Sequence, residues 1–262
     1  MPDGTLLSEI REQPSVLRRL LAIESARIEK IAGHLHARRP AYIFIAARRT
    51  SDNAARYAQY LFGARNRLAV ALAAPSLFTL YSAPPRLEGA LVIGISQSGA
   101  SPDLVAVVEQ ARQQGCATLA ITNDAASPLA RAAAHVVCLH AELERSVAAT
   151  KTYSAELFAL AMLSLALDES RADSALLARV PDLVAQALQR QTDGAITKAA
   201  EYLAPAERCV VIGRGFNYAT AFEIALKLKE LAYIAAEPYS SADFMHGPIA
   251  LVDEALPVVV VN

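Results

Sequence analysis

The sequence has few of the residues from which metal and redox sites are built. Its three cysteines, Cys116, Cys138 and Cys209, are spaced too widely for a CxxC motif, so we interpret them as small core residues in a reducing compartment. Of its five histidines, His34 and His36 would point in different directions from a helix and form no metal pair. The sequence also has no nucleotide-binding fingerprint. We therefore expect no metal site and no cofactor.

An excess of charge of one sign is missing as well, and so are long apolar runs. The 25 Lys and Arg residues nearly balance the 26 Asp and Glu residues, which indicates neither nucleic acid nor an anionic membrane as a partner. The most apolar long segment, residues 157–167, is too short to span a membrane and is flanked by Glu156 and Asp168. The first residues include acidic side chains and lack the apolar core of a secretory signal. These features predict a cytoplasmic protein.

Apolar residues are abundant, at 54% of the sequence against 19% charged residues. Over 262 residues this composition is typical of a globular protein with a large core, in one large or two small domains. Short apolar runs without helical period predict strands at residues 41–46, 68–72, 90–95, 117–121, 136–139, 209–212 and 258–261. Helical patterns predict one or two helices across residues 8–36, with a break suggested at Gln13–Pro14, and further helices at 52–62, 76–81, 102–114, 145–167, 176–191, 195–203 and 218–233. The alternation predicts an α/β fold, a parallel sheet with helices on both faces.

The stretch around which the sequence is organised runs from Leu91 to Leu104. Residues 91–95 predict a buried strand, and residues 96–101 (SQSGAS), which we call the serine loop, follow at once. Pro102 then opens a helix with Ser101 as its N-cap. Backbone N–H groups, the helix dipole and three hydroxyls would converge on one point, which predicts a phosphate site built from neutral donors. The alternative is an ordinary turn between a strand and a helix.

The pattern of the first half restarts near residue 209. When Gly213 is laid on Ala47, an offset of 166 residues (213 minus 47), residues 256–261 fall on the strand at 90–95. At the same offset Asn262 falls on Ser96. We interpret this as an internal duplication of one α/β unit, whose second copy stops where its own serine loop would begin. A chance alignment of two unrelated strand–turn–helix units is the alternative.

Six motifs occur in a fixed order along the chain: IREQPSVLRR, TSDNAARYAQYLF, ISQSGASPD, SVAATKTYSAEL, IGRGFNYATAFEIALKLKE and ADFMHGPIALV. With these motifs, from about Glu9 to Asn262, the sequence resembles the sugar isomerase (SIS) family. The resemblance implies two tandem SIS units, each a flavodoxin-like parallel sheet with helices on both faces, the second of them truncated. It predicts N-terminal helices at residues 1–40, a first SIS domain at 41–190 and the start of a second at 191–262.

The resemblance also implies a set of residues that bind a hexose or hexosamine 6-phosphate. They match the family's SQSG loop, the serine of its GTS turn and the backbone of its VASTK motif, and they are Ser96, Gln97, Ser98, Ser101, Ser51 and Val147. At Ser101 the family usually has threonine, which is a conservative change.

Three further residues match the family's catalytic motifs. The KLKE motif supplies a base for enolisation, matching Glu230, with Lys227 one helical turn before it, and the HGP motif supplies a histidine for ring opening, matching His246. In the family's glutamine–fructose-6-phosphate amidotransferase this histidine comes from the neighbouring subunit, so the resemblance implies a homodimer. Moving a proton between adjacent carbons needs one carboxylate, and ring opening needs a group that titrates near neutral pH. Without the family, Glu230 and Lys227 would be a solvated helix face and His246 a loop residue.

The motifs resemble two types within the family, the isomerase half of the amidotransferase and the stand-alone SIS-type glucosamine-6-phosphate deaminases. Their spacing favours a deaminase, which would convert glucosamine 6-phosphate to fructose 6-phosphate and ammonia. The alternatives are an amidotransferase-like isomerase or a fructosamine-phosphate deglycase, without a glutaminase domain, since Pro2 stands where that domain needs a cysteine. A non-catalytic sugar-phosphate sensor is the alternative of another class, and the presence of Glu230 and His246 argues against it.

The chain departs from the family pattern in two places. The first turn has Ala47 and Arg49 where the family has glycines. If either position needs a positive φ, the side chain costs on the order of 1 kcal/mol, although Arg49 can instead lend its charge to a phosphate or carboxylate. Related proteins also continue past the position of Asn262 to a tail whose lysine reaches the sugar. We therefore expect these residues to belong to a longer polypeptide and to turn over a sugar phosphate poorly on their own.

Overall fold

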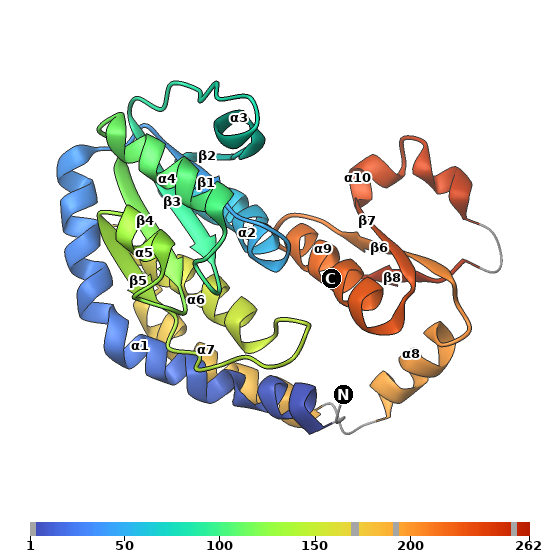
Figure 1. Cartoon of the computed structure of the whole chain (residues 1–262). Coiled ribbons are helices and arrows are strands. Elements are labelled where there is room, and N and C mark those ends of the chain that lie inside the picture. The colour runs from blue at the N-terminus through green and yellow to red at the C-terminus, as the bar shows by residue number, and fades with distance from the viewer. Residues whose placement is uncertain (1–3, 169–172, 191–193, 253–255) are drawn as a thin grey trace.

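The computed structural model describes residues 4–168, 173–190, 194–252 and 256–262. These residues form two α/β units, one around a parallel sheet of five strands and one around a parallel sheet of three (Figure 1). The fold class expected from the sequence, parallel sheets flanked by helices, is confirmed. The expected start of the second unit at residue 191 lies outside the described residues.

The first sheet has the strand order β2-β1-β3-β4-β5, which is the flavodoxin-like order. Its strands are β1 (Tyr42–Ala46), β2 (Ala69–Leu72), β3 (Ala90–Ser96), β4 (Ala117–Thr122) and β5 (His135–Cys138). All seven residues of the central strand β3 are buried, which explains why its sequence is a continuous apolar run. The chain order reverses between β1 and β3, so a ligand is expected to bind beyond the carboxyl ends of these two strands.

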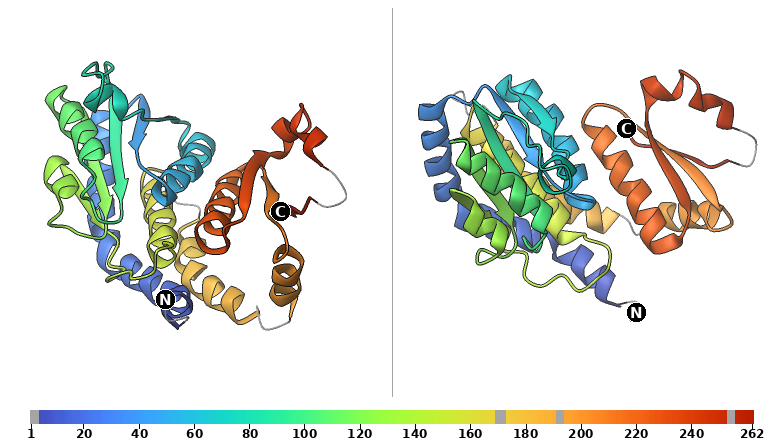
Figure 2. Two further views of the ribbon diagram at one scale, coloured as in Figure 1. Left: turned by 45° about the vertical axis from the view of Figure 1, so that its right-hand side comes forward. Right: turned by 45° about the horizontal axis from the view of Figure 1, so that its top comes forward.

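Helices cover both faces of this sheet, as the two views of Figure 2 show. One face packs against α1 (Gly4–Arg38), α2 (Thr50–Asn66) and α6 (Lys151–Ala166), and the other against α4 (Pro102–Gln113) and α5 (Pro128–Ala132). α6 is apolar around most of its circumference because it is enclosed between the sheet, α1 and α2. α7 (Ser174–Arg190) lies along α1, and the short α3 (Ser76–Thr79) packs against α4.

α1 is a single helix, so the predicted break at Gln13–Pro14 is wrong. Pro14 has no N–H to donate to the carbonyl oxygen of Ile10, its partner in the helical hydrogen-bond pattern. The side-chain amide of Gln13 donates to that oxygen instead, at 3.0 Å. The neighbouring glutamine thus replaces the missing hydrogen bond and allows the proline to remain inside the helix.

The helix predicted at residues 145–167 begins only at Lys151, so its predicted start is wrong. The residues before it form a loop whose N–H groups are bound by a carboxylate from another element. Glu9 of α1 accepts from the backbone N–H of Arg145 at 2.6 Å and of Ser146 at 3.1 Å. Because these donors have a buried partner outside the segment, the segment does not need helical hydrogen bonds to satisfy them.

The second sheet has the order β7-β6-β8. Its strands are β6 (Arg208–Gly213), β7 (Ala235–Ser240) and β8 (Val258–Val260), and its helices are α8 (Ala195–Leu203), α9 (Phe216–Lys227), the π-helix η1 (Leu228–Ala232), α10 (Ser241–Phe244) and the 3-10 helix η2 (Pro248–Leu251). The sequence pattern does not predict β7, because its residues AAEPYS form no apolar run and include a proline. Within the described sheet β7 lies at an edge, where proline and polar residues are tolerated.

The two units repeat one arrangement at the 166-residue offset. The order β2-β1-β3 of the first sheet returns as β7-β6-β8 in the second, and α2 falls on residues 216–232, which α9 and η1 fill together. The backbone before the helix repeats as well: Arg49 has φ 53° and ψ −126°, and Gly215 has φ 61° and ψ −131°. These correspondences favour a duplication over a chance alignment. In Figure 1 the equivalent helices α2 and α9 lie side by side between the two sheets.

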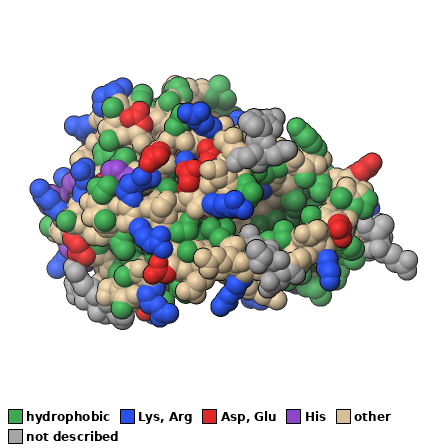
Figure 3. Space-filling model, turned by 90° about the horizontal axis from the view of Figure 1, so that it is seen from below, with side chains coloured by type: hydrophobic (Ala, Val, Ile, Leu, Met, Phe, Trp, Pro, Cys, Tyr) green, Lys and Arg blue, Asp and Glu red, His purple; other side chains and the backbone are tan. Residues whose placement is uncertain are grey.

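The surface carries charges of both signs. On the face shown in Figure 3, basic and acidic side chains are interspersed among apolar ones, in agreement with the net charge of −1. None of the helices that the structure describes combines the length and the apolar character of a membrane span.

Candidate functional site

A pocket of about 510 Å³ opens where the first sheet reverses its chain order. Its walls come from the β1–α2 turn, the serine loop, the loop before α6, α6 itself and η1 of the second unit. The lining residues are Arg48, Arg49, Thr50, Ser51, Ser96, Gln97, Ser98, Ser101, Pro102, Asp103, Val147, Ala149, Thr152, Glu156 and Glu230. The structure thus brings Glu230 together with all the predicted binding residues. In the parts of the chain described, no three His, Cys, Asp or Glu side chains are grouped to hold a metal ion.

The serine loop is fixed by hydrogen bonds to its neighbours. The N–H of Gly99, which has φ 59°, donates to Ser96 Oγ at 3.2 Å. The carbonyl oxygen of Gln97 accepts from the backbone N–H of Asn123, which follows β4, at 3.0 Å. Ser96 is buried, whereas Ser98 is exposed, although Ser98 Oγ also accepts from the backbone N–H of Ala100 at 3.4 Å. Of these two serines, Ser98 is therefore the one whose hydroxyl is more accessible to a ligand.

Ser101 is the N-cap of α4, as predicted, and Pro102 follows it. The backbone of Ser101 is extended, but its side chain accepts no capping hydrogen bond from the helix. Asp103 in the first turn pairs with Arg48 of the β1–α2 turn. The hydroxyl of Ser101 is therefore not committed to its own helix, at a position that lines the pocket.

The β1–α2 turn places a strained arginine at the pocket wall. The φ and ψ of Arg49 fall in a region that residues with a side chain avoid. At the equivalent position of the second unit the same backbone is adopted by Gly215. Strain of this kind costs about 1–3 kcal/mol. Because Arg49 is exposed and lines the pocket, we expect its charge to act on an anionic ligand.

Replacing Arg49 with glycine is expected to move stability and binding in opposite directions. Relief of the strain, less the flexibility of glycine, should raise the free energy of unfolding by about 1 kcal/mol. Loss of the charge should weaken binding of a phosphate-bearing ligand by about tenfold. Thermal melting and titration calorimetry measure the two effects. The control is Arg39→Gly, which relieves a positive φ of 47° outside the pocket and should leave binding unchanged. Equal binding by Arg49→Gly and the parent would contradict the assignment.

Glu230 is held in the pocket by an ion pair with Lys227, which belongs to a polar cluster that is hydrogen-bonded to the first unit. Lys227 Nζ lies 2.8 Å from Glu230 Oε2 and 3.2 Å from Glu223 Oε1. Glu223 is buried and accepts from Asn53 Nδ2 at 2.7 Å and from Thr50 Oγ1 at 3.1 Å, both on α2. These contacts fix α9 against α2, so that a carboxylate of the second unit faces the serine loop of the first.

The backbone changes its helical form at the same point. α9 ends at Lys227, and the chain continues as the π-helix η1, which contains Glu230. Short π-helical turns are frequent at functional sites because they re-aim the side chains that follow. Lys227 does not itself line the pocket, and it reaches the pocket only through its ion pair with Glu230.

His246 lies outside the lining of the pocket. It follows α10, it is exposed, and the next residue, Gly247, has a φ of 134°. It is not among the residues that line the pocket. The pocket of one chain therefore does not include His246, and the resemblance predicts that this histidine acts from a second chain.

Three ionisable residues that line the pocket were not predicted as site residues from the sequence: Arg48, Asp103 and Glu156. Glu156 of α6 is 1% exposed, and its Oε1 accepts from Ser51 Oγ at 2.8 Å. Burial raises the pKa of this carboxyl to about 8, although the bond from Ser51 lowers it, and the carboxylates of Glu223 and Glu144 raise it further. The one signal for Glu156 in the sequence is its position as an acidic residue at the start of the apolar stretch 155–166. A solvent-exposed position on a helix would explain an acidic residue there equally well.

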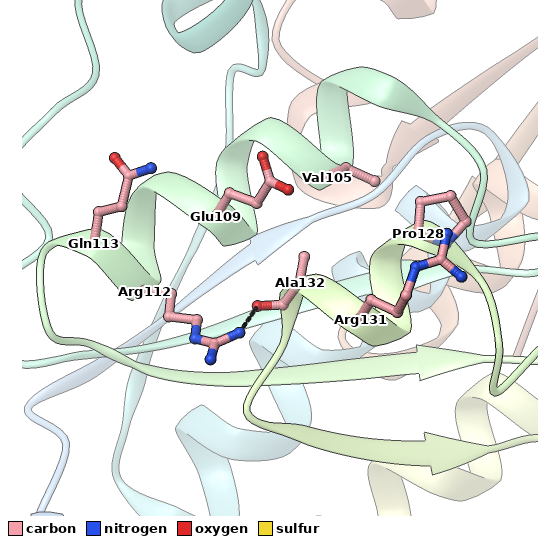
Figure 4. Close-up of a pocket in the computed structure, with 7 residues that line it drawn as sticks. All are labelled: Val105, Glu109, Arg112, Gln113, Pro128, Arg131 and Ala132. Atoms are coloured by element: carbon pink, nitrogen blue, oxygen red, sulfur yellow. Dashed lines mark hydrogen bonds between the residues drawn. The ribbon is translucent and has the colours of Figure 1, made fainter.

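A second hollow, of about 600 Å³, lies between α4 and α5 and contains no predicted site residue (Figure 4). Its arginines are bound to the main chain: Arg112 Nη1 donates to the carbonyl oxygen of Ala132 at 3.4 Å, and Arg131 donates to that of Ala126. It runs along two helices rather than beyond the carboxyl ends of the strands, where ligands of such sheets bind. The serine-loop pocket is therefore the better candidate site.

Comparison with known proteins agrees with this geometry. A family model described as the SIS domain matches residues 38–166 and 202–262. The chain belongs to the SIS domain family. The matched segments include the serine loop and Glu230, and thus both walls of the pocket.

Several named proteins align with most of this chain. The glutamine–fructose-6-phosphate aminotransferase (isomerizing) of Chlorobaculum tepidum, the enzyme also called an amidotransferase, is 36% identical over 273 aligned residues, which cover 98% of this chain and 44% of the relative. The chain thus spans less than half the length of this relative. A protein assigned as a phosphosugar isomerase from Silicibacter pomeroyi DSS-3 has a TM-score of 0.89 and 38% identity, covering 97% of this chain and 76% of that one. The C-terminal domain of the glucosamine-fructose-6-phosphate aminotransferase of Francisella tularensis has a TM-score of 0.83 and 28% identity, covering 98% and 75%.

Proposed function

We propose that the pocket binds a hexose or hexosamine 6-phosphate and that Glu230 moves a proton between the first two carbons of the sugar. The observation that carries this proposal is the composition of the pocket, which has hydroxyl and N–H donors on one wall and the carboxylate of Glu230 on another. The relatives support the substrate class, since they are named for phosphosugars and for fructose 6-phosphate.

In this proposal the phosphate lies at the serine loop. The N-terminus of α4 and the hydroxyls of Ser98 and Ser101 supply neutral donors to the anion. Arg49 adds a positive charge at the edge of the same pocket, whereas Arg48 is paired with Asp103. Binding energy gained at the phosphate then orients carbons that are several bonds away from it.

The conversion of an aldose to a ketose moves a proton between adjacent carbons. One carboxylate can remove the proton from one carbon and return it to the other, and Glu230, oriented by Lys227, has this role in the proposal. The ring must first open, which transfers a proton between the ring oxygen and a hydroxyl. We assign that step to His246 of a second copy of the chain in a homodimer, because His246 does not line the pocket of its own chain.

Within this class we favour isomerisation of the aminotransferase type, because a relative 36% identical to this chain carries that name. The deamination of glucosamine 6-phosphate, which the motif spacing favours, uses the same proton transfer and remains a prediction. So does the deglycation of a fructosamine phosphate. Ammonia release across a panel of amino sugar phosphates, assayed with the complete gene product, separates these reactions. A protein that binds the sugar phosphate but catalyses neither proton exchange nor ammonia release would be a non-catalytic sugar-phosphate sensor.

Replacing Ser98 with alanine is expected to weaken binding of fructose 6-phosphate by about tenfold or more, since a hydrogen bond to a charged group is worth about 1.5–3 kcal/mol. The melting temperature should stay the same, because the side chain is exposed. Titration calorimetry measures the affinity, with Ser15→Ala, which removes an exposed hydroxyl from α1, as the control. Equal affinities of Ser98→Ala and the parent would remove the serine loop from the phosphate site.

A further inference from the structure

Glu156 lies at the base of the pocket with one of its two carboxyl oxygens unpaired. Its Oε1 accepts from Ser51 Oγ, while Oε2 is buried and has no hydrogen-bond partner among the described residues. A buried carboxylate is strongly unfavourable unless its oxygens are paired or hydrogen-bonded. The neutral acid is satisfied more easily, because its proton can be donated to Ser51 and a single acceptor remains.

The charges that face Glu156 also favour its neutral form. Glu223 of α9 and Glu144 of the loop before α6 are the carboxylates that act on it, and the phenol of Tyr153 lies on its own helix. Lys227 is engaged on the other side of Glu223, with that carboxylate and with Glu230.

The remaining charged groups of the pocket, Arg48 and Arg49 of the β1–α2 turn and Glu230 of η1, share its lining. Burial is the main cause that raises the pKa of Glu156 to about 8. The hydrogen bond from Ser51 lowers this pKa, and the carboxylates of Glu223 and Glu144 raise it further. Both protonation states are therefore accessible near neutral pH.

The protonation of Glu156 decides what Ser51 offers to a ligand. When Glu156 is ionised, the hydroxyl of Ser51 donates its one proton to Oε1 and presents only lone pairs to the pocket. When Glu156 is neutral, it donates to Ser51 Oγ, and the hydroxyl proton is free to turn toward the pocket. A phosphate oxygen accepts hydrogen bonds and donates none when it is ionised, so it is repelled by the first arrangement and bound by the second.

We propose that a phosphate in the pocket and a proton on Glu156 stabilise each other, so that binding of the sugar phosphate takes up a proton at this carboxyl. One proton moves from solvent to Glu156, the hydrogen bond between Glu156 and Ser51 reverses its direction, and no covalent bond to carbon or phosphorus changes. Glu156 is a positioning residue that acts through Ser51. The inference rests on the proposed function and adds to it that the bound phosphate reaches Ser51, which lines the same pocket as the serine loop.

Titration calorimetry with fructose 6-phosphate measures this coupling. At pH 8 the sugar phosphate is already a dianion, so heats recorded in buffers of different ionisation enthalpy report protons taken up by the protein. A carboxyl that ionises near pH 8 should take up about half a proton there, and the Kd should rise about tenfold between pH 7 and pH 9.

Two variants isolate the carboxyl. Glu156→Gln keeps the shape of the side chain and its amide donates permanently to Ser51, so the uptake at pH 8 should disappear and the Kd should change by less than about twofold between pH 7 and pH 9. Glu109→Gln removes an exposed carboxyl from α4 and should behave as the parent. A stability readout accompanies binding. At Glu156 the folded chain keeps a proton that the unfolded chain has lost between about pH 4.5 and pH 8, so the contribution of this group to stability should fall as the pH rises through this window. Glu156→Gln should lack this contribution.

A parent Kd that stays flat from pH 7 to pH 9 overturns the inference while the proposed function stands, whether or not the variant folds. A Glu156→Gln protein that keeps the pH dependence of the parent overturns it too. Failure of the parent to bind fructose 6-phosphate at any of these pH values overturns the proposed function, and the inference with it.

Discussion

Replacing Glu230 with glutamine is expected to slow proton exchange at C1 or C2 of the sugar by at least about 100-fold, the usual contribution of a positioned acid–base group. Glutamine has nearly the same shape but cannot hold the proton in transit. Binding should change by less than about threefold, because the phosphate contacts lie on other walls of the pocket. Exchange is followed by NMR of fructose 6-phosphate or glucosamine 6-phosphate in D₂O with the complete gene product.

The contact between Lys227 and Glu230 makes a control necessary. The variant loses an ion pair that is partly buried, so its melting temperature must be compared with that of the parent. Glu201→Gln, which changes the same charge on the exposed side of α8, should exchange at the parent rate. Normal exchange by a folded Glu230→Gln protein would mean that another group carries the proton, and Glu156 would then be the first to examine.

Replacing Gly99 with alanine is expected to destroy the phosphate site and to lower stability. A Cβ at this position would collide with the side chain of Ser127 and lie 2.9 Å from Thr122 Oγ1, and the φ of 59° is itself unfavourable for alanine. The backbone strain costs about 1–3 kcal/mol, and the collision adds to it. The shift of Gly99 would also disturb the hydrogen bonds that Ser96 and Gln97 make in the serine loop. We therefore expect affinity for fructose 6-phosphate to fall by at least about 100-fold.

A second glycine separates the two causes. Gly115 has φ 79°, and a Cβ there would meet no atom within 4 Å. Gly115→Ala should therefore show the strain alone, as a melting temperature a few degrees lower with unchanged binding. If Gly99→Ala bound the sugar phosphate as well as Gly115→Ala does, the serine loop would not be the phosphate site.

Much of the fold can be predicted from the sequence because the pattern is local. The apolar runs of β1, β3 and β4 are continuous since both faces of the sheet are covered. The elements that were missed depend on contacts from elsewhere in the chain. α1 stays continuous because the side chain of Gln13 replaces a backbone donor, and α6 begins late because Glu9 binds N–H groups of the preceding loop.

The site shows the same division. The serine loop is a short segment whose hydroxyls, glycine and following helix can be recognised together, and the structure places it at the expected end of β3. Glu156 could not be recognised, because its importance arises from its burial against Ser51, a residue of another helix that is far away in the sequence. The strain at Arg49 was a conditional expectation. The structure shows a positive φ at Arg49, while Ala47 is not among the described residues with a positive φ.

The predicted role of His246 depends on a second chain and is a different kind of inference. No periodicity or spacing within one chain can reveal a residue that acts in the pocket of another. An exposed position beside Gly247 is compatible with such a role, and dimerisation measured in solution would be its first requirement.

The central claim, that the serine-loop pocket binds a sugar phosphate, is tested most directly by amide NMR shifts recorded while fructose 6-phosphate is added to the protein. Binding at the serine loop predicts that the largest shifts fall on the amides of Gln97 to Ser101 and of Ser51, since N–H groups at a helix N-terminus sense a bound anion strongly. Amides of the hollow between α4 and α5, near Arg112 and Arg131, should not move. The largest shifts in that hollow, with none in the serine loop, would contradict the claim.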